Sequence, residues 1–339
     1  MPAEKDRVAW ADWVKGIGIL SVVLGHVSQY FPGGDKYLNH VIYSYNIPLF
    51  ILWAGVSASM WPDKYSISRK AFYIKRLKRY LIPYVLFSII NSAIKIGVLF
   101  ISNKLTPEII KDEALAFFIT GNGTVWFLVT LFAVETIYYE TQKCRGVWII
   151  IVTAGCLLPF LFQGTATPFM ILLMRTIFGF FYFMVGYLFW NRYQKYEDQS
   201  ENRKSLMTGL SFIAAGCIMA FFCQYRIEFF SGRFSNGTAA IPISLLFSVG
   251  IILFCYARKE ADSSILKMLQ YFGKESMLIM LVHPTILLLF TYPFGNWFVS
   301  LQGITAFLAS MVLFAIIVLL NIPVIYVINR WLPILKGEF

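Results

Sequence analysis

Two ionisable side chains, Lys15 and His26, lie inside the first hydrophobic segment, WADWVKGIGILSVVLGHVSQYF at residues 10–31. A charged side chain in a membrane-spanning helix costs about 2.5–3.5 kcal/mol on insertion scales, so such residues usually mark a function. Eleven residues make about three helical turns, so both side chains are expected on one face, roughly 16 Å apart along the axis. The spacing predicts a cation near one membrane surface and, deeper in, a neutral histidine that can accept a proton.

Three further residues of this segment support the pair. Asp12 precedes Lys15 by three positions, which allows a helical ion pair that lowers the cost of the lysine. Gly18 and Gly25 lie on a neighbouring stripe, where they would allow close approach of another helix or of a ligand. A simpler interpretation is a lysine that snorkels to the surface and a structural histidine, and the spacing alone does not choose between the two.

A second group of candidates is the basic stretch SISRKAFYIKRLKRYLIPY at residues 66–84, which we expect to be a loop before the third span. Arg76 and Arg79 are three positions apart and, with Lys75, suit a ligand that carries several phosphates, because arginine grips phosphate bidentately. Ordinary loop charge or contact with anionic lipids explains most basic loops and remains the alternative.

Single polar residues in other apolar segments form the third group. His283 lies in mid-span before Pro284, which frees a backbone carbonyl; it is either structural or part of the site. Glu135 and Arg175 are charges in the fourth and sixth spans, where they could pair with each other or line a cavity. Trp126 is expected as an interfacial anchor or a sugar-stacking residue, and the position of Asn46 beside the second span is similarly ambiguous.

Positioning these groups requires a membrane-embedded bundle. The 339 residues are 58% hydrophobic and 14% charged, whereas soluble proteins have about 25% charged residues. We predict an all-α integral membrane protein whose single multi-pass domain covers residues 1–339. Hydropathy suggests about ten transmembrane helices, at approximately 13–31, 43–61, 80–101, 117–139, 147–162, 170–190, 205–223, 241–257, 276–291 and 303–327.

Basic residues set the expected orientation. With the N-terminus inside and ten alternating spans, 21 of the 29 lysines and arginines fall in cytoplasmic segments and 5 in outer loops. That bias follows the positive-inside rule and predicts cytoplasmic N- and C-termini. The same bias accounts for the net charge of +11, so nucleic-acid binding is not expected. The five scattered cysteines fit no zinc or redox spacing, and no metal is expected.

Several of these motifs, taken in order, resemble the integral-membrane acyltransferase-3 family. The first is Lys15-x10-His26, in place of the arginine-x10-histidine of many relatives. The others are NIPLFILWAGVSAS at 46–59, RLKRYLIPY at 76–84, VWFL at 125–128 and LVHP at 281–284. The greatest similarity is to polysaccharide O-acetylases of the fucose 4-O-acetylase-like type. Lysine at position 15 loses the bidentate contacts that arginine would make.

The resemblance implies transfer of an acyl group, usually acetyl, from cytoplasmic acetyl-CoA to a hydroxyl of an envelope glycan or lipid-linked saccharide. His26 would be the general base or carry the acyl group itself. Arg76, Arg79, Lys75 and Lys15 would hold the CoA phosphates, and Asp12 would fix Lys15. Supporting roles fall to His283 and Glu135, and a place in the substrate lining to Trp126, Arg175 and Asn46. The expected location is the bacterial cytoplasmic (inner) membrane.

Other functions remain open at this point. A proton-coupled glycan or lipid transporter could use Lys15, His26, Glu135 and Arg175 as a relay, although no internal repeat is visible. A non-catalytic membrane sensor would need none of these groups. Within the enzyme class, the acceptor could be an amine, the donor another acyl-CoA, or a separate partner could complete the transfer.

Overall fold

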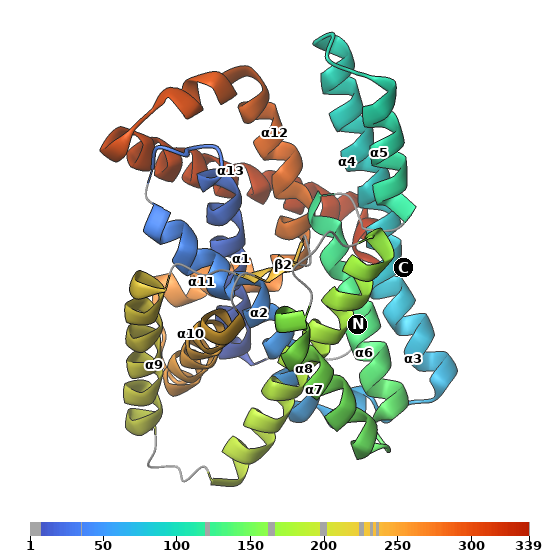
Figure 1. Cartoon of the computed structure of the whole chain (residues 1–339), viewed down its shortest axis with the longest axis vertical. Coiled ribbons are helices and arrows are strands. Elements are labelled where there is room, and N and C mark those ends of the chain that lie inside the picture. Colours follow the sequence, from blue (N-terminus) through green and yellow to red (C-terminus); the bar gives the residue numbers. More distant parts are fainter. Residues whose placement is uncertain are drawn as a thin grey trace.

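The computed structural model describes residues 8–34, 36–118, 123–161, 167–196, 202–223, 227–230, 233–234 and 237–338, and nearly all of them are helical (Figure 1). The all-α architecture is confirmed; its small exception is an antiparallel hairpin of two-residue strands, β1 (Ile227–Glu228) and β2 (Arg233–Phe234). The helices are α1 (Ala9–Ser28), α2 (Lys36–Met60), η2 (Pro62–Lys64), α3 (Arg69–Arg76), η3 (Leu77–Leu81), α4 (Ile82–Ile101), α5 (Pro107–Phe118), η4 (Gly123–Val125), α6 (Trp126–Thr141), α7 (Arg145–Leu161), α8 (Pro168–Tyr196), α9 (Asn202–Phe222), α10 (Gly237–Ala257), α11 (Ser264–Lys274), α12 (Ser276–Ser300), α13 (Gly303–Trp331) and η5 (Pro333–Lys336).

Seven helical stretches of the described chain are long and apolar enough to cross a membrane, so the protein is a multi-pass membrane protein. The seven include α2, α8, α9, α10, α12, α13 and the stretch from Arg69 to Ile101. The spans expected at 13–31, 117–139 and 147–162 correspond to α1, α6 and α7, which are not among them. The count of ten and the orientation therefore stay predictions. Lys5, Arg7 and Arg226, which entered the charge count, lie outside the described residues.

The first helix, α1, lies in the interior of the bundle, in contact with α2, α10, α11, α12 and α13 (Figure 1). Glycines make its contact with α11 close. A Cβ atom at Gly16 would overlap the backbone carbonyl of Leu269, and one at Gly273 would overlap the carbonyl of Asp12. Because only glycine leaves room for these two backbones, α11 and the start of α12 are brought up against the first turns of α1.

The basic stretch is helical from Arg69 onward, so the loop expected there is wrong. Ser68 caps α3 by accepting a hydrogen bond from the backbone N–H of Ala71 at 3.4 Å. α3 then runs through η3, a π-helical segment, into α4 without a break. A loop was expected because the charged residues precede the apolar part of the helix, and hydropathy detects only that apolar part. π-helical segments within α-helices are frequent at functional sites.

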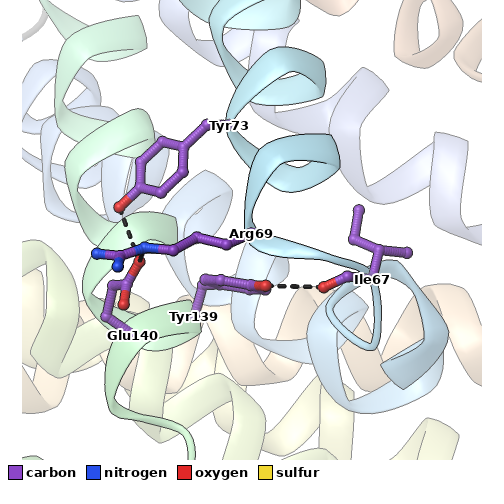
Figure 2. A network of polar contacts seen from close by, with 5 residues as sticks. All are labelled: Ile67, Arg69, Tyr73, Tyr139 and Glu140. Carbon is purple, nitrogen blue, oxygen red and sulfur yellow. Dashed lines mark hydrogen bonds and ion pairs between the residues drawn. The ribbon is translucent and has the colours of Figure 1, made fainter.

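Polar contacts hold this basic helix against the end of α6 (Figure 2). Arg69 Nε and the Tyr73 hydroxyl both bind Oε1 of Glu140, each at 2.9 Å. The Tyr139 hydroxyl donates to the carbonyl of Ile67 at 2.7 Å. These contacts join segments about 70 positions apart in the chain, and they fix the side of α3 that faces the bundle interior.

Candidate active site

A cavity of about 820 Å³ lies beside the first turns of α1, between α2, η3, α6 and the start of α12. This volume is within the range of about 300–1,000 Å³ that is usual for ligand sites. Most of its charged lining is basic: five cations against two carboxylates. The cations are Lys15, Lys64, Arg76, Arg79 and Lys274, and the carboxylates are Asp12 and Glu135. The cavity therefore suits an anionic ligand.

Lys15 and Asp12 form the expected helical ion pair at the wall of this cavity. Lys15 Nζ lies 2.6 Å from Asp12 Oδ1, and the Asp12 side chain is only 1% exposed. The lysine is 25% exposed, so its ammonium remains accessible from the cavity. A paired, half-buried lysine can bind one more anion without leaving its carboxylate.

Arg76 is held by an ion pair that the sequence did not identify. Its Nε contacts Oε2 of Glu135, and the two side chains are 3% and 7% exposed. The Tyr80 hydroxyl donates to the other carboxylate oxygen at 2.7 Å. The Arg76 guanidinium also lies over the rings of Tyr65 and Phe72, at 5.1 and 5.2 Å from their centroids. Arg76 is thus fixed in place before any ligand arrives.

Lys64, which the sequence did not single out as a candidate, lines the cavity from η2. Its Nζ lies 4.0 Å from the ring centroid of Trp61 and 3.4 Å from Oγ of Ser57. Burial, followed by repulsion from Arg79 and Arg76, lowers the pKa of Lys64 to about 8. The amine therefore titrates close to physiological pH, and a bound phosphate would favour its charged form.

Arg79 and Lys75 differ in their position relative to the cavity, although both belong to the same basic stretch. Arg79 lines the cavity while remaining exposed, which places it at the mouth. Lys75 is exposed and is not part of the cavity lining. The structure therefore places Arg76, Arg79 and Lys15 in the lining of one cavity and leaves Lys75 outside it.

Apolar side chains line the inner end of the cavity, among them Phe50, Phe127 and Met280, and neither His26 nor His283 is one of the lining residues. The Phe50 ring lies against Gly18, where a Cβ atom would be 2.9 Å from its Cε2. The rings of Phe50 and Phe127 meet edge to face, with centroids 5.9 Å apart. Gly18 therefore does allow a close approach, and the group that lies against it is the aromatic ring of Phe50.

His26 and His283 meet beyond this apolar end, with ring centroids 5.2 Å apart. Along α1, Gly18 with its covering ring lies between Lys15 and His26; along α12, the cavity residue Met280 comes three positions before His283. His283 is fully buried, and its Nδ1 lies 2.7 Å from the carbonyl of Ile279. Two imidazoles in an apolar interior can accept and pass a proton.

A family model described as an acyltransferase domain, that of the acyltransferase-3 family, matches residues 8–330. The chain belongs to the acyltransferase-3 family. No match is found among curated proteins, and none among solved structures. Membership supports a membrane acyltransferase over the transporter and sensor alternatives.

In this acyltransferase Glu135 and Arg175 do not pair with each other; of the two alternatives expected for them, lining a cavity holds for Glu135 and not for Arg175. Glu135 binds Arg76, whereas Arg175 donates from Nε to the carbonyl of Phe229 at 3.0 Å and also binds the carbonyl of Phe230. Both carbonyls belong to the turn of the β1–β2 hairpin. Arg175 binds this turn because the backbone of the turn lies within reach of its guanidinium. A buried guanidinium requires hydrogen-bond acceptors for its N–H groups.

Trp126 and Asn46 are also packed inside this acyltransferase. Trp126 begins α6, as expected, but it is 6% exposed, and the Arg175 guanidinium covers its ring at 4.6 Å from the centroid. The ring face that could have stacked on a sugar is therefore occupied. Asn46 is 3% exposed and its Oδ1 accepts from the backbone N–H of Ile47 at 2.8 Å. Neither residue lines the cavity.

Proposed function

We propose that this acyltransferase transfers an acyl group, in the first instance acetyl, from acyl-CoA on the cytoplasmic side of the bacterial inner membrane to a hydroxyl of an envelope or exported polysaccharide. The observation that carries the proposal is the cavity with five cations, an apolar inner end and a histidine pair beyond it. CoA has matching parts: several phosphates, an adenine and a narrow arm that ends in the thioester.

The phosphates would contact the cations that remain accessible. Arg79 and Lys274 are exposed lining residues, and Lys15 and Lys64 are half-buried beside them. Arg76 is a poorer candidate for a primary phosphate contact, because Glu135 already neutralises it. It can still use guanidinium donors that the carboxylate leaves free.

The chemistry would take place at His26. The acceptor hydroxyl attacks the thioester carbonyl while His26 takes the hydroxyl proton. A C–O bond forms, the C–S bond breaks, and the proton then passes to the departing CoA thiolate. In the alternative route His26 attacks first and carries the acyl group as acyl-histidine before the hydroxyl displaces it. Both routes consume one thioester and release one ester and one thiol.

The test is transfer of radiolabelled acetyl from acetyl-CoA into envelope glycan by membranes with and without the protein. His26→Ala is expected to lower the rate by about 10²–10⁴, the usual contribution of a general base. Expression level and thermal stability serve as the controls. Transfer that is equally fast with His26→Ala would rule out this role. Failure of the label to pass from acetyl-CoA into the glycan, with the protein present, would point to another donor or another acceptor.

A further inference from the structure

We propose that His283 is a positioning residue that sets the tautomer of His26 and keeps its basic nitrogen free for the acceptor hydroxyl. This inference rests on the proposed function, because it assumes that His26 is the base. It starts from the way in which α12 presents His283.

Proline at position 284 leaves the carbonyl of Met280 without its helical N–H partner. The hydroxyl of Thr124, from η4, supplies the missing bond and donates to that carbonyl at 2.6 Å. Asn91 on α4 braces the next turn, since Thr285 Oγ1 donates to its Oδ1 at 2.6 Å. The backbone around His283 is therefore held from two neighbouring elements, which a residue with a fixed orientation requires.

The hydrogen bond at Nδ1 decides the tautomer of His283. The carbonyl of Ile279, 2.7 Å away, can only accept, so Nδ1 must carry a proton. A neutral imidazole protonated at Nδ1 has a lone pair at Nε2. That Nε2 is buried and has no hydrogen-bond partner among the described residues. A histidine with a purely structural role would be expected to satisfy both nitrogens.

The ring of His26 lies beside that of His283, although no hydrogen bond joins His26 to Nε2 in this structure. At a centroid separation of 5.2 Å, ring nitrogens of two imidazoles can come within hydrogen-bond distance. If His26 donates its N–H to Nε2 of His283, the other nitrogen of His26 must hold the lone pair. This is the role that a third residue has in a catalytic triad, where it orients the base and stabilises its protonated form. Here a neutral histidine takes that role.

Two substitutions distinguish the role of Nδ1 of His283 from that of Nε2. His283→Asn keeps an amide that can donate to the carbonyl of Ile279 but has no group at the position of Nε2. His283→Gln reaches that position with an amide oxygen, which can accept from His26. We expect His283→Asn to lower kcat by about 10²-fold or more with the KM for acetyl-CoA unchanged, and His283→Gln to retain activity within about tenfold of the wild type.

The wild-type protein provides a test that does not depend on the folding of a variant. The chain contains only three histidines, so ¹⁵N-histidine NMR in detergent can resolve each ring. We expect His283 as the Nδ1–H tautomer. The opposite tautomer would overturn the proposal, as would wild-type kcat in His283→Asn or equal inactivity of the asparagine and glutamine variants. Full activity of His26→Ala would instead refute the proposed function itself.

Discussion

The buried ion pair between Arg76 and Glu135 allows a quantitative prediction. Glu135→Gln keeps the size of the side chain and an acceptor for the Tyr80 hydroxyl, but it leaves the Arg76 guanidinium without its counter-charge. Both side chains of the pair are nearly inaccessible, at 3% and 7%. Breaking a buried pair by removing one partner costs about 3–5 kcal/mol. Because the pair borders a cavity, we expect the lower end of this range, about 3 kcal/mol.

The chain offers a matched control in the second Arg–Glu pair that joins the same two helical segments. Arg69 and Glu140 are 73% and 35% exposed, and exposed pairs contribute little. At about 2 °C per kcal/mol for a chain of this size, Glu135→Gln should lower the apparent Tm in detergent by about 6 °C. Glu140→Gln should leave it within error of the wild type, at one fixed heating rate.

A double substitution shows whether the effect comes from the pair. In Arg76→Met combined with Glu135→Gln no buried charge is left alone, so we expect the double variant to be more stable than Glu135→Gln. Equal losses of Tm for Glu135→Gln and Glu140→Gln would refute the reasoning. A double variant whose loss is the sum of both single losses would do the same.

Three further predictions concern single side chains. Phosphate binding favours charged Lys64, whose pKa is about 8, so the KM for acetyl-CoA should rise as the pH increases through that value; in Lys64→Arg, which stays charged, it should be flat. Arg79→Ala should raise the same KM by about 10- to 100-fold through loss of a charge-assisted contact of about 1.5–3 kcal/mol. Lys75→Ala, outside the cavity, should leave it unchanged, and equal effects would contradict the assignment. Arg175→Met removes the donors that bind the carbonyls of Phe229 and Phe230 and should speed limited proteolysis at these two residues; an unchanged cleavage rate would argue against this anchor.

The sequence was sufficient to predict features that depend on local periodicity. A single helix determines the spacing of Lys15 and His26 and the pairing of Asp12 with Lys15, and both features could be predicted without tertiary information. The helical fold follows in the same way, because it needs only long apolar segments. The family resemblance rested on the order of such local motifs, and it is confirmed.

Partners that come from different helices could not be predicted. Glu135 was expected to pair with Arg175 or to line a cavity, and no rule of spacing identifies Arg76, on a separate helix, as its partner. Lys64 was not singled out, because its contact with the cavity depends on how η2 folds back. The meeting of His26 with His283 likewise depends on how α12 crosses α1. Sequence spacing carries no information about such crossings.

The Phe50 ring, seated on Gly18 and meeting the ring of Phe127, has a consequence for the membrane itself. The proposed transfer of an acyl group from a charged donor on one side of the membrane to an acceptor on the other requires that the protein does not conduct ions. An apolar constriction between a hydrated cavity and the opposite side resists wetting. Each charge that leaked across would dissipate about 2.3 kcal/mol per 100 mV of membrane potential. A side chain larger than glycine at position 18 would displace the Phe50 ring, because even a Cβ atom there would lie 2.9 Å from its Cε2, and in the proposed enzyme the apolar barrier beside the cavity would be weakened.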